Sequence, residues 1–151
     1  MPTYKLHHKQ IAPISMEEAW AFFSNPSNLK DITPPYMGFE ILSDPADQMY
    51  QGQIIEYNVR PVLGIPLYWM TEITAVKENA FFIDEQRFGP YSLWHHQHFF
   101  REVDNGIEIE DIVHYRLPLG ILGSIAHGVF VKKQLEGIFQ FRAEYIKKKW
   151  P

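Results

Sequence analysis

Hydrophobic and polar residues alternate along most of the chain, a pattern that predicts a protein built mainly of β-strands. Alternation begins at residues 3–12, which we expect to form the first strand. Ser15 then has a glutamate three residues later, the spacing of a helical capping box, so a short helix is predicted to run through Phe23. Pro26 can begin a second short helix, which the pair Pro34-Pro35 ends.

From Met37 onward, strand-like segments follow one another, separated by turn signals. The strongest of these signals is Asn105-Gly106, because both residues tolerate a positive φ angle. Consecutive strands joined by tight turns predict an antiparallel meander. The expected strands are 37–43, 52–60, 67–77, 80–88, 92–103 and 107–117.

A helical pattern replaces the alternation near the C-terminus. One apolar stripe at helical spacing predicts a long helix that packs on the sheet; it consists of Val131, Leu135, Ile138, Phe139 and Ile146. A twisted antiparallel sheet can curl around such a helix and leave space for a pocket. The apolar segment 119–128 contains three glycines and is either a helical lead-in or a mobile rim that admits ligand. Residues 62–66 are a second candidate rim loop.

Composition narrows the class of protein. The 151 residues suit one domain, 1–151, and 46% of them are hydrophobic. A net charge of −4 argues against nucleic-acid binding, and the absence of cysteine excludes disulfides and thiolate metal sites. The longest nearly uncharged stretch, 61–71, is too short to span a membrane. The lack of cysteine and of an apolar export signal fits a reducing compartment, so a cytoplasmic location is expected. The aromatic content of 15% favours a pocket.

Alternation also predicts which polar side chains point inward. In segment 107–117, Asp111 shares its face with apolar residues, while the other face is mostly charged. A buried carboxylate needs a partner or a proton, and the neighbouring strand offers His96 or His98. We therefore predict a small polar island inside an aromatic wall, consisting of Asp84, Gln86, His96, His98, Asp111 and Tyr115.

The residues of this island allow several interpretations. His96, His98 and Asp111 form a set of two histidines and one carboxylate that could bind a metal ion. A structural Asp–His hydrogen bond and a role in orienting ligand or moving a proton are the alternatives. Asp84 and Gln86 can contact ligand or tie down the Gly89-Pro90 turn. The sequence does not indicate which histidine, if either, pairs with Asp111.

Several motifs together resemble the SRPBCC superfamily, the START-like and polyketide cyclase/dehydrase-like group. They are Asn25-Pro26, Ile32-Thr33-Pro34, Asp84-Glu85-Gln86, Gly89-Pro90-Tyr91, the series Trp94, His96, His98, Phe100, and the series Asp111, Val113, Tyr115, Pro118, Gly120. The resemblance is greatest to a bacterial ligand-binding branch of mostly uncharacterised members. It implies an α+β helix-grip fold, in which a curved antiparallel sheet of about seven strands wraps around a long C-terminal α-helix. Two short helices are expected between strands one and two.

The expected function is the binding of a hydrophobic or amphipathic small molecule, lipid-like or aromatic, in a cavity between the sheet and the C-terminal helix. We expect these residues to contact ligand: Trp69, Phe82, Asp84, Gln86, Trp94, His96, His98, Phe100, Asp111, Tyr115 and Phe139. One alternative is a cyclase- or dehydratase-type enzyme with His96, His98, Asp111 and Tyr115 as catalytic candidates. Another is a protein-interaction module with a vestigial cavity. No cofactor and no metal ion are expected.

Overall fold

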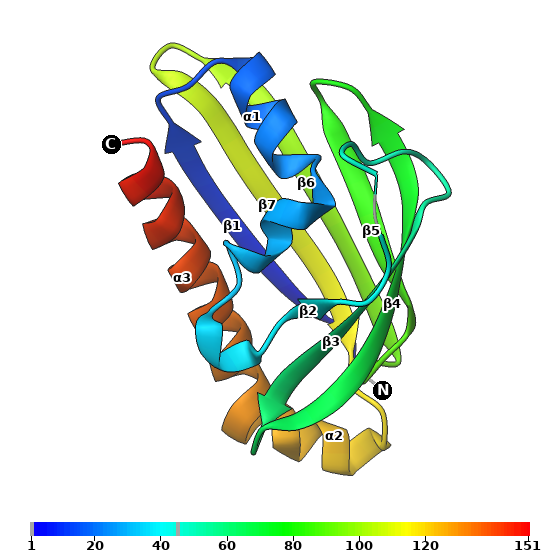
Figure 1. The fold of residues 1–151 in the computed structure, drawn as a ribbon. Coiled ribbons are helices and arrows are strands. Elements are labelled where there is room, and N and C mark those ends of the chain that lie inside the picture. The colour runs from blue at the N-terminus through cyan, green and yellow to red at the C-terminus, as the bar shows by residue number, and fades with distance from the viewer. Residues whose placement is uncertain (1, 45) are drawn as a thin grey trace.

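A single antiparallel sheet of seven strands forms the body of the protein, which a computed structural model describes for residues 2–44 and 46–151 (Figure 1). The spatial order of the strands is β1-β7-β6-β5-β4-β3-β2. Strands β2 to β6 therefore each pair with the next strand in the sequence, and the last strand, β7, also pairs with the first, β1. The strands are β1 (Tyr4–Ala12), β2 (Glu40–Ile41), β3 (Ile54–Val62), β4 (Ile65–Lys77), β5 (Phe81–Phe88), β6 (Leu93–Val103) and β7 (Gly106–Arg116).

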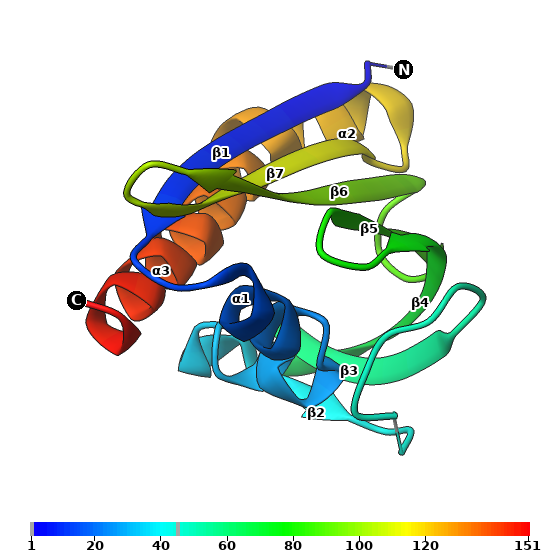
Figure 2. The same cartoon turned by 90° about the horizontal axis from the view of Figure 1, so that it is seen from above.

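The helices lie on the concave side of this sheet. Figure 2 shows the sheet bending round from β1 to β2, with the long helix α3 (Lys132–Lys149) across its open side and α1 (Met16–Phe23) beside it. Two 3-10 helices, η1 (Pro26–Lys30) and η2 (Pro35–Met37), connect α1 to β2. This arrangement confirms the predicted helix-grip fold, including the short helical segments between the first two strands.

Alternating burial explains why the strands adopt this orientation. Along β7 every second residue is buried, from Ile107 to Tyr115, and the residues between them are half-buried. The buried set is the one that the sequence pattern predicted to face inward, and it includes Asp111. At one end of the sheet, Trp20 and Phe23 of α1 pack against Phe100, and these rings fill the space there.

Two predicted segments differ from the structure. The strand expected at 37–43 is reduced to the two residues of β2, because η2 continues to Met37 and Gly38 adopts a left-handed conformation. The rim loop expected at 62–66 is instead a hairpin in which only Leu63 and Gly64 separate β3 from β4. Both residues have a positive φ, 52° and 68°, which suits the twist of a two-residue hairpin.

The C-terminal helix begins earlier than α3. Helix α2 (Gly120–Ala126) leads through a π-helical turn, η3 (His127–Val131), directly into α3. Gly123 allows α2 to lie close to the end of β7, because a Cβ atom there would clash with the carbonyl oxygen of Pro118. Among the residues that the structure describes, no helix is both long and apolar enough to cross a membrane.

Candidate ligand-binding cavity

A cavity of about 450 Å³ lies between the concave face of the sheet and the C-terminal helix. This volume falls in the range of small-molecule binding sites. Most of its wall is apolar and comes from β3, β4, β6, α2 and α3; representative residues are Ile55, Val59, Leu67, Trp69, Trp94, Leu122, Leu135, Ile138 and Phe139. Trp69 and Trp94 pack edge to face with ring centroids 5.3 Å apart and form an aromatic section of the wall.

The polar part of the wall comes from three adjacent strands. Asp84 on β5 lies directly opposite His96 on β6, and His98 lies opposite Asp111 on β7. All four side chains point to the concave face, because each occupies an inward position of its strand. Together with Arg142 of α3 they form what we term the buried ionic network.

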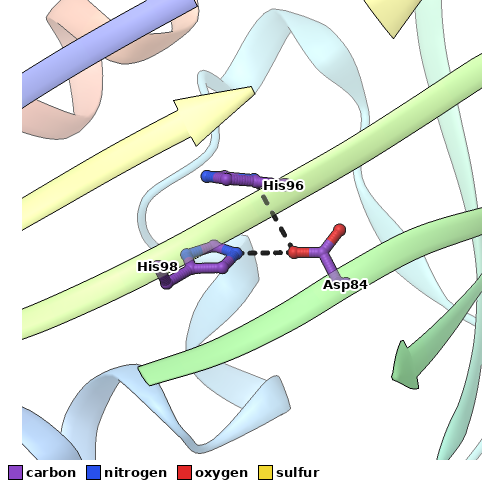
Figure 3. Close-up of side chains that lie close together, drawn as sticks. All are labelled: Asp84, His96 and His98. Carbon is purple, nitrogen blue, oxygen red and sulfur yellow. Dashed lines mark hydrogen bonds and ion pairs between the residues drawn. The ribbon is translucent and has the colours of Figure 1, made fainter. Parts of the chain in front are cut away.

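Hydrogen bonds in this network run diagonally across the strands. His96 Nε2 lies 2.8 Å from Asp111 Oδ1, and His98 Nε2 lies 2.5 Å from Asp84 Oδ2. His98 Nδ1 also lies 3.3 Å from Asp111 Oδ1, so both nitrogens of this imidazole face a carboxylate. The two imidazole rings stack with centroids 3.6 Å apart, and Figure 3 shows them beside Asp84.

Burial and neighbouring charges set the protonation states. Burial and the charge on His98 lower the pKa of His96 to about 4, so this imidazole is neutral at pH 7. Burial also opposes protonation of His98, but hydrogen bonds to Asp111 and Asp84 outweigh it and raise the pKa. Burial opposes ionisation of Asp111, yet hydrogen bonds from His96 and His98 hold its pKa well below the usual range. Burial likewise opposes ionisation of Asp84, but the nearby imidazole of His96, the hydrogen bond from His98 and the charge on Arg142 lower its pKa.

Arg142 completes the network, and the sequence analysis did not identify it. Its Nη1 lies 3.4 Å from Asp111 Oδ1, and its guanidinium carbon lies 4.8 Å above the ring of Phe139. The sequence does contain one indication that Arg142 faces the sheet. Residue 142 continues the apolar stripe of Leu135, Phe139 and Ile146 at helical spacing. An arginine at such a position indicates a buried acidic partner.

A metal ion could be held by part of this network. Asp84, His96 and His98 each bring one ligand atom to within 4.8 Å of the others. Such an ion would have to displace the proton of His98. Without an ion the two carboxylates already face the guanidinium of Arg142 and the imidazole of His98, whose raised pKa favours its charged form. Hydrogen bonds and ion pairs among these side chains therefore hold the network together.

Most of the residues expected to contact ligand lie on the cavity wall. They are Trp69, Phe82, Asp84, Trp94, His96, His98 and Phe139. Asp111 lies behind the histidines, with 4% of its side chain exposed. Phe100 packs in the core against Trp20. Tyr57 and Thr71, which the sequence analysis did not single out, also line the cavity and add two hydroxyl groups.

Gln86 and Tyr115 lie outside the predicted polar island. The amide of Gln86 donates to the carbonyl oxygen of Tyr91 and accepts from its backbone N–H, so it fixes the turn after β5. Its position near the end of the strand explains the difference. The Tyr115 hydroxyl lies 2.7 Å from His127 Nε2 and so connects β7 to the π-helical turn.

Comparisons with known proteins support the fold alone. No family model and no curated protein matches the sequence. Among solved structures, the chain is similar to TTHA0849 of Thermus thermophilus, with 14% identity and a TM-score of 0.70 over 97% of this chain and 99% of that one. It is also similar to major latex-like protein 151 of Panax ginseng, with 12% identity and a TM-score of 0.70 over 99% and 98% of the two chains.

A further similarity covers only part of a larger protein. The nucleoside-diphosphate sugar epimerase of Corynebacterium glutamicum matches at 19% identity and a TM-score of 0.65. The match covers 93% of this chain but 28% of the epimerase chain. At these identities the neighbours indicate a helix-grip fold and leave the function to be argued from the cavity.

Proposed function

We propose that this protein binds a hydrophobic or amphipathic small molecule inside the cavity. The observation that carries the proposal is a void of about 450 Å³ with a mostly apolar wall and one buried ionic network. Apolar surface around a void gains free energy when a ligand replaces water or empty space. A compact polar patch in such a wall orients one end of the ligand.

The mouth of the cavity supports the same proposal. Leu119, Leu122 and Ala126 of the segment leading into and through α2 line the cavity, and the first two are largely exposed. In Figure 1, α2 lies at the end of the molecule where β3 turns into β4. An apolar ligand would therefore meet an apolar rim before it enters.

The enzyme alternative has less support. Most ring nitrogens that could act as a general base are engaged: His98 faces a carboxylate at each nitrogen, and His96 Nε2 donates to Asp111. His96 Nδ1 lies 3.6 Å from Asp84 Oδ2. An interaction module with a filled interior is likewise disfavoured by the size of the void. The binding module fits both observations without further assumptions.

The proposal predicts that blocking the mouth prevents binding. Purified protein is titrated with N-phenylnaphthylamine, an uncharged probe that fluoresces in apolar surroundings, and native mass spectrometry records any co-purified ligand. Ala126→Trp places a large ring on the cavity wall and is expected to weaken probe binding at least tenfold. Ile125→Trp is the matched control, because Ile125 is exposed and lies next to Ala126 without lining the cavity.

Two results would contradict the proposal. One is the absence of saturable probe binding by the unmodified protein together with no co-purified ligand. The other is equal loss of binding in both tryptophan variants, which would place the probe on the outer surface of α2. Circular dichroism spectra of the variants check that each retains the fold.

A further inference from the structure

Asp84 differs from Asp111, the other carboxylate of the buried ionic network, because it lines the cavity. Oδ2 accepts the hydrogen bond from His98 Nε2 and lies 3.6 Å from His96 Nδ1. Within the described parts of the chain, no hydrogen bond reaches Oδ1. Figure 3 shows both contacts converging on one oxygen while the other points away from both rings. The side chain is 16% exposed, compared with 4% for Asp111, and it lines the cavity.

The two basic groups His98 and Arg142 both contact carboxylates of the network. His98 directs its two nitrogens at Asp84 and Asp111. Arg142 also lines the cavity; its Nη1 lies 3.4 Å from Asp111 Oδ1, its guanidinium packs over Phe139, and its Nε is buried, with no hydrogen-bond partner in the described residues. Asp84 Oδ1 is therefore an acceptor of the network that remains available to a ligand in the cavity.

An ionised oxygen in an apolar wall has a clear chemical preference. It costs free energy when no donor faces it, and a ligand hydroxyl or N–H group recovers that cost. A ligand carboxylate would instead place a second negative charge beside Asp84. An ammonium group is not required, because His98 donates to Asp84 and the guanidinium of Arg142 already supplies a positive charge beside Asp111. Nearby Tyr57 remains a neutral phenol, since burial and the charge on Asp84 raise its pKa.

We propose that the cavity selects apolar molecules that carry an uncharged hydrogen-bond donor, a hydroxyl or N–H group, and that Asp84 Oδ1 accepts from this donor. This inference rests on the proposed binding function and specifies its ligand class. Asp84 is then the specificity-determining residue of the site, and the aromatic wall around Trp69 and Trp94 holds the apolar part of the ligand.

Three matched aromatic ligands test the inference. β-Naphthol carries a donor, its methyl ether has the same rings without the donor, and β-naphthoate carries a carboxylate. Calorimetric titration at pH 7 is expected to show that β-naphthol binds about tenfold or more tightly than the other two, the size of effect expected for one hydrogen bond to a charged acceptor. Since this comparison uses the unmodified protein, it does not depend on how any variant folds.

Substitution of Asp84 then tests whether the preference for β-naphthol comes from a hydrogen bond between its hydroxyl and Asp84 Oδ1. Asp84→Asn removes the negative charge and turns the open acceptor into an amide, so the advantage of β-naphthol over its ether should fall to within about threefold. The affinity for β-naphthoate should rise. Glu85→Gln is the matched control, because it removes an acid from the neighbouring position of β5, which points to the opposite face of the sheet. It should leave all three affinities unchanged.

The outcomes separate this inference from the proposed function. If N-phenylnaphthylamine binds and the three naphthalene ligands bind equally, the cavity is a ligand site but the donor preference is wrong. Tightest binding of β-naphthoate would also overturn the inference, since Arg142 or His98 would then dominate recognition. If neither the probe nor any of the three ligands binds, the proposed function itself fails.

Discussion

Asp111 accepts a hydrogen bond from His96 and lies within ion-pair distance of His98 and Arg142, so three side chains share one buried carboxylate. The two histidines respond to this environment in opposite ways. The fold favours the neutral form of His96 and the charged form of His98. Removing one partner from such a network leaves an uncompensated charge, which makes the network sensitive to protonation.

The lowered pKa of His96 predicts a loss of stability in mild acid. In the unfolded chain this imidazole titrates near 6.5, whereas in the folded protein it titrates near 4. Between these values the unfolded state binds a proton that the folded state rejects, so the free energy of unfolding decreases as pH falls through this window. The full contribution is about 3 kcal/mol, from the two pKa values and the free energy per pKa unit. His98 acts in the opposite sense, because its raised pKa adds stability that is lost as pH rises through that pKa.

A glutamine at position 96 isolates this effect. Its side-chain amide can donate to Asp111 as Nε2 does, but it cannot be protonated. Denaturant unfolding of the wild type and His96→Gln, measured from pH 7 to pH 4, should show the wild type losing stability relative to the variant. His95→Gln, on the outer face of the same strand, serves as the control. Parallel curves for wild type and His96→Gln would mean that His96 is protonated in the folded protein.

At this scale the sequence allowed part of the site to be predicted. Asp111 could be placed inside because its neighbours at alternate positions are apolar, and His96 and His98 followed from the same period. The diagonal pairing could not be predicted, because it depends on the relative register of three strands and on side-chain rotamers. Arg142 was missed because its helix lies far from the strands in sequence, and a stripe position alone does not reveal the partner across the interface.

At the scale of elements, the C-terminal helix is divided by the π-helical turn η3. Such turns are rare and often accompany functional regions of helices. Here the turn carries His127, which accepts or donates a hydrogen bond at Tyr115 and stacks on Tyr4 with ring centroids 3.5 Å apart. The sheet thus holds the helix at the point where α2, the rim of the cavity, gives way to α3.

The Tyr115–His127 contact should control how readily this rim opens. Tyr115→Phe removes the hydroxyl and leaves the ring packing in place, so α2 and η3 lose one connection to the sheet. Amide hydrogen exchange across 120–131 is expected to become about threefold to tenfold faster, while β7 exchanges as before. Tyr91→Phe is the control, because Tyr91 belongs to the same aromatic cluster and the described structure records no hydrogen bond of its hydroxyl. Unchanged exchange in Tyr115→Phe would show that the stacking on Tyr4 is sufficient.

Element boundaries followed from the sequence wherever alternation was continuous. Strands β5, β6 and β7 lie within about one residue of their predicted bounds, because turn residues flank apolar runs on both sides. The strand predicted at 37–43 was wrong in extent, and the loop predicted at 62–66 is a turn of only two residues. The length of an edge strand such as β2 depends on how far it can pair with its neighbour, which local sequence preference does not reveal. The turn between β3 and β4 was hard to predict because Leu63, which has a positive φ there, is not a typical turn residue.

At the scale of the whole molecule, the cavity means that the sheet and the helix are not packed to the density of a typical core. One end of the concave face is filled by α1 and its aromatic contacts, whereas the other end stays hollow between β3, β4 and α3. A void forgoes dispersion contacts, so keeping it costs stability. Substitutions that fill the cavity should therefore raise the stability of the protein and weaken ligand binding.

A substitution that fills the void should change stability and ligand binding in opposite directions. Val59→Phe adds a ring at a buried position that lines the cavity, and we expect it to raise the free energy of unfolding by about 0.5–2 kcal/mol while weakening N-phenylnaphthylamine binding. Val113→Phe makes the same change at a buried position of β7 that does not line the cavity, where overpacking should destabilise the protein by about 1–3 kcal/mol or more. Denaturant unfolding of both variants, beside probe titration of the first, compares the two sites directly. Equal destabilisation by the two substitutions would mean that no usable space lies beside Val59, and the hollow interior on which ligand binding depends would then be too small to accept a ring.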